Sequence, residues 1–142
     1  MFQFAVTRVP EVIREVLTKN ELLMDDIDYF VLHQANRRIV EAVAKRLRQP
    51  IEKFPMNLQE YGNTSSASIP ILLDEMNRSG KLKKGQKLVV AGFGAGLSII
   101  LTILQWMRPM KDRDYRTFGN PLSDYPGRHG LGGRLSSGGC RV

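Results

Sequence analysis

Two short segments of this sequence carry polar groups among small neighbours, next to apolar stretches. His33 is followed by Gln-Ala-Asn at 34–36, and Asn63 is followed by Thr-Ser-Ser-Ala-Ser at 64–68. Imidazole and carboxamide groups both donate and accept hydrogen bonds, so either segment could hold a ligand. A run of small side chains also permits the close approach of another backbone or of a buried helix. These two segments are therefore the first candidates for a functional site.

Both segments also have ordinary structural explanations. A lone histidine at the end of a strand is more often a structural residue than a catalytic one. Asn63 or Thr64 could simply cap a helix by accepting a hydrogen bond from a backbone N–H. In open α/β sheets, however, ligands bind beyond the carboxyl ends of strands, and His33 follows an apolar run that predicts a strand. The sequence pattern leaves both interpretations open.

A third candidate is the glycine-rich segment at 92–96, which has the sequence Gly-Phe-Gly-Ala-Gly. A dinucleotide-binding loop needs Gly-x-Gly-x-x-Gly between a strand and a helix. Here β-rich residues follow, and no Lys-Ser/Thr ends the segment. The pattern favours a tight bend between two strands, which either exposes backbone N–H groups to a site or serves only as a turn.

Basic side chains gather in the segment after His33. Residues 35–48 contain a single acidic residue, Glu41, and the following basic residues: Arg37, Arg38, Lys45, Arg46 and Arg48. A charged run on a helix is usually only its solvated face. Nucleic-acid binding would require a recognised module or stacking aromatic residues among the basic ones, and this segment has neither.

Composition favours one globular domain of moderate size. The chain has 142 residues, and the hydrophobic fraction of 42% is enough for a real core. No apolar run approaches the length of a membrane span, and the N-terminus has no signal-peptide pattern, so a cytoplasmic location is the default expectation. The single cysteine, Cys140, excludes an intrachain disulfide. With two histidines far apart in sequence, a metal site is not expected.

The net charge of +7 is unevenly distributed. Residues 1–107 carry a net charge of +3, and residues 108–142 carry +4. The second segment also holds 7 of the 13 glycines and lacks any helical or alternating apolar period. We therefore place a domain boundary near Met107 and expect residues 108–142 to form a disordered tail.

The apolar periodicity of residues 1–107 alternates between helical and strand-like patterns. The expected elements are a helix at 2–19, a strand within 25–34, a helix at 35–47, a weak strand at 53–58, a helix from 64 to 80, and two strands within 87–106. Pro10 implies either a kink or two helices end to end in the first element. The resulting order, α-β-α-β-α-β-β, predicts a layered α/β fold.

Three motifs together carry a family resemblance. VLHQANRRIVEAVAKRL at 31–47, NLQEYGNTSSASIPILLDEM at 57–76 and GFGAGL at 92–97 are similar to the C-terminal half of β-ketoacyl-acyl-carrier-protein synthase III, within the thiolase fold. The motifs occur in the expected order, and Asn63 lies 30 positions after His33. The resemblance covers about residues 1–107 and implies a layered α-β-α half-domain.

The resemblance implies roles for several residues. His33 and Asn63 would donate hydrogen bonds to the thioester carbonyl of malonyl-acyl-carrier protein during decarboxylation. The pantetheine arm or the thioester would contact Asn36 and Phe2. The loop Gly94, Ala95 and Gly96 would supply a backbone N–H to a second oxyanion, although the family usually has three glycines in a row there. Ala95 keeps its N–H and suits this role only if its φ is negative.

The resemblance also implies partners and substrates. An acidic acyl carrier protein would dock at Arg38, Lys45 and Arg46, and the substrates would be acyl-CoA and malonyl-acyl-carrier protein, with no further cofactor. The family's cysteine nucleophile belongs to an N-terminal half that we expect to precede the start of this chain. Cys140, near a glycine-rich end, lacks the helix that would activate it.

The expected function is thus the acyltransferase half of a synthase of fatty acid or polyketide biosynthesis, inactive alone. The family forms homodimers, so a homodimer is possible, and an unpaired half would expose apolar helix faces. The alternative is a non-catalytic remnant or binding module that docks acyl carrier protein or a partner subunit.

Overall fold

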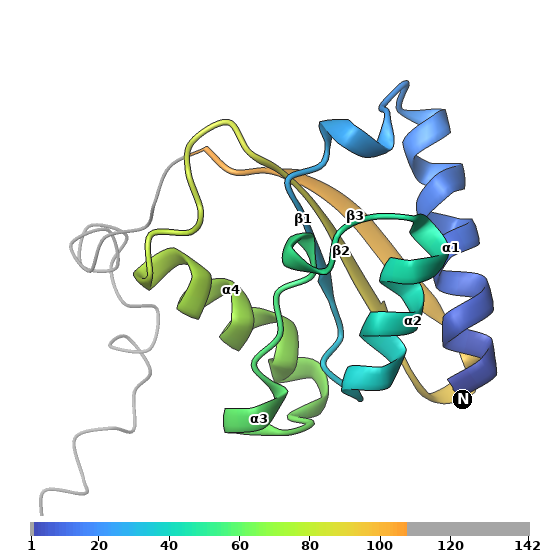
Figure 1. Ribbon diagram of the computed structural model, residues 1–142. Helices are drawn as coiled ribbons and strands as arrows, with labels where there is room; N and C mark the ends of the chain where they lie inside the picture. Colours follow the sequence, from blue (N-terminus) through green and yellow to red (C-terminus); the bar gives the residue numbers. More distant parts are fainter. Residues whose placement is uncertain (1, 108–142) are drawn as a thin grey trace, which may run out of the picture. The chain divides into compact units, whose positions relative to one another are not determined.

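The computed structural model describes residues 2–107, except the side chain of Ala95, and forms three layers (Figure 1). The predicted tail at 108–142, with Cys140, lies outside the described residues. The helices and strands are α1 (Phe2–Lys19), β1 (Tyr29–Leu32), α2 (Arg37–Leu47), α3 (Leu58–Tyr61), α4 (Ser68–Arg78), β2 (Lys87–Phe93) and β3 (Ile99–Gln105). Short 3-10 helices occupy Met24–Asp26, Ile51–Lys53, Ser65–Ala67 and Ala95–Leu97. The predicted α/β class is confirmed.

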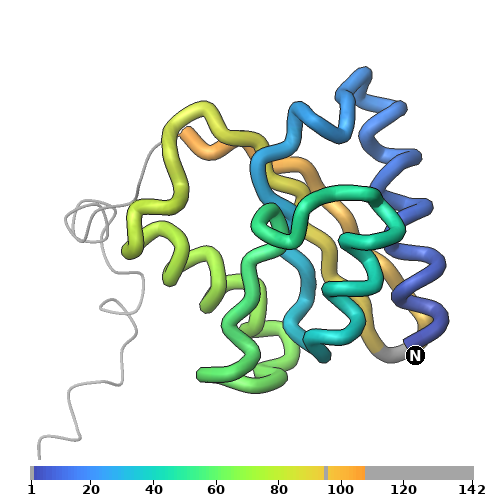
Figure 2. The backbone as a smooth tube through the Cα atoms, in the orientation of Figure 1, coloured from blue at the N-terminus to red at the C-terminus, as the bar shows by residue number. Residues whose placement is uncertain are grey.

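The three strands form one sheet in the order β1-β2-β3. β1 runs parallel to β2, with Leu32 opposite Ala91, and β3 runs antiparallel to β2, with Gly92 opposite Ile100. α1 and α2 cover one face of the sheet, and α4 lies on the other face (Figure 1). Figure 2 follows the chain from α2 on the first face to α3 and α4 on the second. This topology places the end of β1 beside the glycine-rich bend that follows β2.

α1 is a single helix that continues through Pro10. Its buried side includes Ala5, Val9, Ile13 and Leu17, which recur every four residues and therefore lie on one face. Proline removes one intrahelical hydrogen bond, but the turns on both sides remain helical. The alternative of two helices end to end is therefore wrong.

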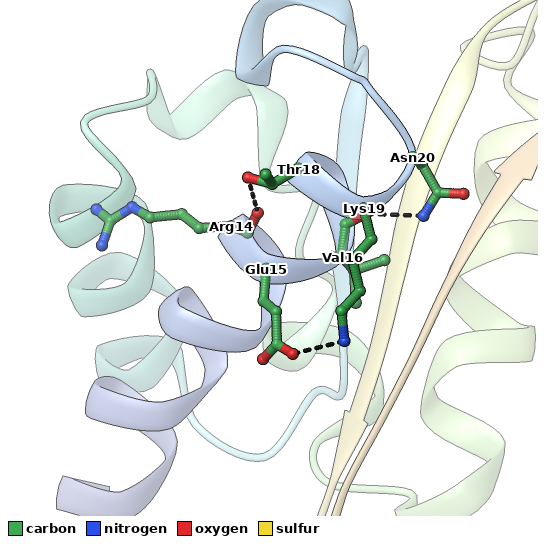
Figure 3. Close-up of polar contacts among 6 residues, drawn as sticks. All are labelled: Arg14, Glu15, Val16, Thr18, Lys19 and Asn20. Atoms are coloured by element: carbon green, nitrogen blue, oxygen red, sulfur yellow. Dashed lines mark hydrogen bonds and ion pairs between the residues drawn. The ribbon is translucent and has the colours of Figure 1, made fainter.

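Side-chain contacts hold the last turns of α1 (Figure 3). Thr18 Oγ1 donates to the carbonyl of Arg14 at 2.9 Å, and Asn20 Nδ2 donates to a carbonyl four residues earlier at 2.7 Å. The Lys19 ammonium lies 2.7 Å from the Glu15 carboxylate, where its hydrogen bond lowers the pKa of Glu15. α1 ends at Lys19, as the sequence predicts.

Alternation along the strands divides the core into two clusters. Phe30 of β1 and Val89 of β2 pack against α1 and α2. Val31 and Leu88, which are the sequence neighbours of Phe30 and Val89, point to the opposite face and pack toward α4. β1 is thus buried on both faces, which explains why its sequence is continuously apolar.

The weak strand expected at 53–58 is absent. Phe54 is buried and stacks on a ring of β1, while the next residue, Pro55, has no N–H to offer a neighbouring strand. The side-chain amide of Gln34 instead provides hydrogen-bond partners for this irregular backbone. Its Nε2 donates to Pro55 O at 3.5 Å, and its Oε1 accepts from the N–H of Asn57 at 3.3 Å. A buried side chain therefore replaces the strand partner.

α4 begins at Ser68, four residues later than the sequence pattern predicts. Ser65 has φ of 56°, which is incompatible with a right-handed α-helix, and the turn Ser65–Ala67 is a 3-10 helix. Gly62, with φ of 64° and ψ of −151°, adopts a conformation that is essentially restricted to glycine. The loop before α4 is therefore bent by local backbone conformation before the helix starts.

β3 leaves part of the sheet uncovered. Ile99, Leu101 and Ile103 pack toward α1 and α2, whereas Ile100 and Leu104 point the other way and are 78% and 38% exposed. Apolar helix faces were expected to be exposed, but α1 and α2 bury theirs against the sheet. The exposed apolar surface here is therefore a sheet face, on an outer strand without charged residues.

We expect this uncovered face to promote self-association, because outer strands that expose apolar residues and lack charge tend to pair. Ile100→Thr should shift the chain toward the monomer in sedimentation velocity at matched concentration. Leu23→Thr is the control, since Leu23 is 72% exposed but lies in the loop after α1. An equal effect of both changes would contradict a specific role for β3.

Candidate active site

His33 directly follows β1 and is held in place by its backbone and its ring. Its N–H donates to Ala91 O at 2.8 Å, which extends the pairing of β1 with β2 by one residue. Its ring meets Phe93 edge-on, with a centroid distance of 5.4 Å and an interplanar angle of 74°. The prediction that His33 lies at a strand end is confirmed, and two strands determine where its imidazole lies.

An open cleft of about 460 Å³ lies beside His33. Its lining comprises His33, Ser65, Ser66, Ile69, Val90, Gly92, Phe93, Gly94, Ser98, Ile100 and Thr102. The sheet forms its floor at Gly92, where an added Cβ would lie 3.9 Å from Ile69 Cδ1. The small residues at 65–66 border the cleft, so the run of small side chains leaves open space next to His33.

The buried hydroxyl of Ser68 joins His33 to the start of α4. His33 Nδ1 lies 2.7 Å from Ser68 Oγ, and the N–H of Gln34 donates to the same oxygen at 3.2 Å. Ser68 is 2% exposed. This contact was not predicted from the sequence, yet the sequence carries a signal for it. Ser68 falls on the buried stripe of α4 that continues with Leu72 and Met76, where a polar residue needs a partner.

The surroundings of His33 favour its neutral form. Burial lowers the pKa of His33 below its ordinary value of 6.5, because removal from water disfavours the charged imidazolium. Ser68 is also the first residue of α4, and the partial positive charge of a helix N-terminus disfavours a cation there. At neutral pH, His33 is therefore an uncharged hydrogen-bonding group.

The lowered pKa of His33 predicts a measurable pH dependence. An NMR titration of a His129→Gln variant, which leaves one histidine, should give a pKa for His33 below 6.5. Because the unfolded chain binds a proton more readily at this position, the free energy of unfolding should fall as the pH drops below about 6.5. A His33→Gln variant should lose this part of the pH dependence. A titration midpoint above 6.5 would contradict the effect of burial.

Asn63 lies in the exposed loop before α4. Its Oδ1 accepts a hydrogen bond from the N–H of Ser65 at 3.0 Å, so the carbonyl end of its amide caps the local turn. Among the described residues, Asn63 does not line the cleft, but Ser65 and Ser66 do. The hydrogen bond to Ser65 engages the acceptor atom of Asn63 and leaves the Nδ2 donors for another partner.

Asn36 and Phe2 occupy positions away from the cleft lining. Asn36 is the N-cap of α2, and its Oδ1 accepts from the N–H of Arg38 at 2.8 Å. Phe2 is the first residue of α1 and is 46% exposed. Neither residue is among the described residues that line the cleft. Contact of either with a pantetheine arm stays a prediction.

The glycine-rich bend joins β2 to β3, as the sequence predicts. The N–H of Gly94 donates to Ser98 O at 3.3 Å and is therefore engaged within the bend. Gly96 has φ of 74°, in the left-handed region that favours glycine. Ala95 begins the 3-10 turn Ala95–Leu97, and its side chain lies outside the described part of the structure. Its proposed role as an oxyanion donor stays a prediction.

The basic side chains of α2 are exposed on the helix surface. Arg37 forms an ion pair with Glu41 at 2.7 Å. Within residues 2–107, Arg38, Lys45 and Arg46 have no acidic partner within ion-pair distance. These three residues therefore present uncompensated positive charge, a pattern that suits an acidic partner.

A buried polar network that was not predicted from the sequence supports the backbone around His33. Gln34 is 1% exposed, and its Nε2 donates to Leu32 O at 2.8 Å. Asn57, joined to Gln34 through its backbone, donates from Nδ2 to Glu75 of α4 at 2.9 Å. The network joins the end of β1, the loop before α3 and α4, so it links the two elements that carry His33 and Ser68.

Two features are absent from residues 2–107. None of the helices in this range is long and apolar enough to cross a membrane. In the same range, no group of three histidine, cysteine or acidic side chains is arranged to hold a metal ion.

Comparison with known proteins gives consistent matches. Residues 17–106 match the profile of the family described as 3-oxoacyl-[acyl-carrier-protein] synthase III C terminal. The β-ketoacyl-[acyl-carrier-protein] synthase III of Acaryochloris marina is 52% identical over 108 residues, covering 76% of this chain and 32% of the relative. The enzyme of the same name from Microcystis aeruginosa is 55% identical over 106 residues, covering 75% of this chain and 32% of the relative. The chain thus spans about a third of the length of these relatives.

Solved structures agree with these matches. The 3-oxoacyl-(acyl carrier protein) synthase III of Pseudomonas aeruginosa PAO1 superposes with a TM-score of 0.74 at 40% identity, over 78% of this chain and 35% of that one. The corresponding structure from Thermus thermophilus gives a TM-score of 0.71 at 41% identity, over 74% of this chain and 33% of that one. The predicted thiolase-like fold is confirmed, and the chain belongs to the 3-oxoacyl-[acyl-carrier-protein] synthase III C-terminal family.

Proposed function

We propose that this chain forms the carboxyl-terminal part of a β-ketoacyl-acyl-carrier-protein synthase active site in fatty acid synthesis. In this role, His33 and Asn63 bind the thioester carbonyl of malonyl-acyl-carrier protein. The observation that carries the proposal is the position of His33, a neutral imidazole at the end of a strand, beside an open cleft bordered by small residues.

The proposed chemistry places negative charge on one oxygen atom. As malonate loses carbon dioxide, the bond to its carboxylate breaks and the electron pair moves onto the thioester carbonyl oxygen. Two fixed, uncharged donors lower the energy of that enolate oxygen because they need no reorganisation during the reaction. The enolate carbon then attacks an acyl thioester held on a cysteine, and the cysteine thiolate leaves.

Asn63 can take part only through its nitrogen. An enolate oxygen needs a donor, and the Oδ1 of Asn63 already accepts from Ser65. The bound carbonyl would therefore lie between Asn63 Nδ2 and His33, at the mouth of the cleft next to residues 65–66. The second oxyanion, formed when the cysteine thioester is attacked, would receive the N–H of Ala95.

The cysteine must come from another segment in this proposal. The sequence has a single cysteine, Cys140, and residues 1–139 have none. The attacking and leaving steps require a thiolate close to His33. We therefore expect the chain by itself to form no product from acyl-CoA and malonyl-acyl-carrier protein.

A chimera tests the proposal directly. The matched region of the Acaryochloris marina relative, which covers 108 residues, is replaced by that of this chain. Formation of β-ketoacyl product is then measured for the chimera, the parent enzyme and the isolated chain. Activity of the chimera and none of the isolated chain is the expected result. A folded chimera that binds acyl carrier protein without forming product would instead support the alternative of a non-catalytic binding module.

The exposed surface of α2 suggests where the carrier protein docks. Arg38, Lys45 and Arg46 are uncompensated cations, and acyl carrier proteins are acidic. Complementary charge steers association and sets orientation more than it adds affinity. Arg38 lies in the first turn of α2, which starts four residues after His33, so docking there would bring the carrier arm to the edge of the sheet where β1 ends.

Charge reversal on α2 should therefore weaken carrier binding. We expect Arg38→Glu in the chimera to raise the Kd for acyl carrier protein about 10-fold at low salt and less at high salt. Lys83→Glu is the control, because it changes net charge equally in the turn before β2. Binding can be followed by fluorescence anisotropy of labelled carrier protein. Equal weakening by both substitutions would indicate a general charge effect instead of a docking site.

A further inference from the structure

The two hydrogen bonds of Ser68 determine where its own proton can go. Its Oγ accepts from the N–H of Gln34 at 3.2 Å and lies 2.7 Å from His33 Nδ1. Among the described residues, Ser68 Oγ has no third hydrogen-bond partner. Ser68 is also 2% exposed, so bulk water does not reach its hydroxyl to serve as a hydrogen-bond acceptor.

This geometry distinguishes the two neutral forms of His33. If Nδ1 carried the proton, Ser68 Oγ would accept twice and its buried hydroxyl proton would have no acceptor. Leaving a buried donor without a partner is costly, so this arrangement is disfavoured. If Nδ1 is bare, the Ser68 hydroxyl donates to it while accepting from Gln34, and every polar group in the cluster is satisfied.

The ring of His33 cannot easily turn to change this assignment. Phe93 meets the imidazole edge-on at 74° and 5.4 Å, and the backbone of His33 is tied to Ala91. The ring edge that carries Nδ1 faces Ser68, because Nδ1 lies 2.7 Å from Ser68 Oγ. The other ring nitrogen, Nε2, is separated from Nδ1 by Cε1 and has no hydrogen-bond partner among the described residues, and His33 borders the cleft.

We propose that Ser68 is a positioning residue that keeps the proton of His33 on Nε2. The Ser68 hydroxyl donates to Nδ1, and Nε2–H is the hydrogen-bond donor available to a ligand. Ser68 can do this because it is the first residue of α4 and occupies the buried stripe of that helix. A side chain without a hydroxyl at this position would leave both tautomers accessible.

The catalytic value of this tautomer rests on the proposed function, whereas the tautomer itself does not. Decarboxylation requires a donor toward the thioester oxygen, and the Nδ1–H tautomer would present a lone pair there instead. Ser68 would thus keep His33 in the form that stabilises an enolate. A repulsive contact between the Nε2 lone pair and the developing negative charge is avoided.

The test is long-range ¹H–¹⁵N NMR of the full chain with ¹⁵N-labelled histidine at neutral pH, in a His129→Gln background. We expect wild-type His33 to show an unprotonated Nδ1 and a protonated Nε2. In Ser68→Ala the ratio of the two tautomers should shift toward Nδ1–H by about fivefold, from loss of one hydrogen bond. Ser68→Thr, which retains a hydroxyl, should restore the wild-type ratio.

Ser79→Ala is the matched control. Ser79 lies at the other end of α4, and its hydroxyl donates to Met76 O at 3.2 Å, so its loss should leave the His33 spectrum unchanged. A protonated Nδ1 in the wild-type spectrum would overturn the proposal without any variant. An unchanged tautomer ratio in folded Ser68→Ala would overturn it as well. Neither result depends on the chimera, whose failure would affect only the proposed function.

Discussion

Replacing His33 with alanine in the chimera is expected to lower the rate of condensation about 100- to 1,000-fold, the usual cost of removing one oxyanion donor. The reason is that the imidazole beside the cleft is a preorganised, uncharged donor, and alanine has no group to replace it. The measurement is kcat for β-ketoacyl product, together with the rate of carbon dioxide release from malonyl-acyl-carrier protein. Both rates should fall together, because in the proposed mechanism His33 acts before the new carbon–carbon bond forms.

Comparison variants separate this effect from a general disturbance of the site. Ser79→Ala, at the far end of α4, should leave kcat unchanged. Asn63→Ala should lower kcat by a similar factor, and the double variant should lose less than the product of the two single effects, since in the proposed mechanism both donors bind one oxygen. Near-normal carbon dioxide release by His33→Ala would contradict its proposed role in decarboxylation.

Replacing Phe30 with alanine is expected to lower the free energy of unfolding by about 3 to 5 kcal/mol, the cost of deleting a large ring from a close-packed core. Phe30 is 0% exposed and stacks on Phe54 with a centroid distance of 4.9 Å and an interplanar angle of 12°. The change leaves a cavity between β1 and the segment before α3. Urea denaturation followed by circular dichroism gives the difference from wild type.

The control for Phe30→Ala removes an exposed ring. Tyr61, at the end of α3, is 50% exposed, so Tyr61→Ala should change the free energy of unfolding by less than about 0.5 kcal/mol. Phe30→Leu should cost less than Phe30→Ala because it fills part of the cavity. Similar losses for the Phe30 and Tyr61 variants would mean that this part of the core is not close-packed.

Elements with a clear apolar period were predicted well from sequence. The continuous apolar run of β1 follows from burial on both faces, and the two β-rich runs around 92–96 became β2 and β3. In these segments local preference and tertiary packing agree. α1 also ends where its periodic pattern ends, at Lys19.

The prediction failed where a distant side chain decides the backbone conformation. The segment 53–58 has apolar residues like a strand, but the amide of Gln34 supplies the hydrogen bonds that a neighbouring strand would otherwise provide. The start of α4 was predicted too early because the positive φ of Ser65 has no signature in residue type. The positive φ of Ser65 is instead set by the conformation of the surrounding loop.

The candidate site was predicted in part for similar reasons. His33 and the small residues at 65–66 were found because their types and order are distinctive. The contact between His33 and Ser68 joins residues 35 positions apart, and no local periodicity specifies it. Asn63 shows the opposite situation, since its capping contact with Ser65 is local and follows from the residue types.

The parallel pairing of β1 with β2 has a consequence for how the chain is made. Tyr29 lies opposite Leu88, 59 residues later, so β1 emerges from the ribosome long before its partner strand exists. α1, β1 and α2 can collapse on one another early, because they are close in sequence. β2 and β3 form a local antiparallel hairpin, which closes quickly once both strands are synthesised. We therefore expect addition of that hairpin to β1 to be the step that brings His33 beside Phe93, so that the cleft is completed only after β2 and β3 are synthesised.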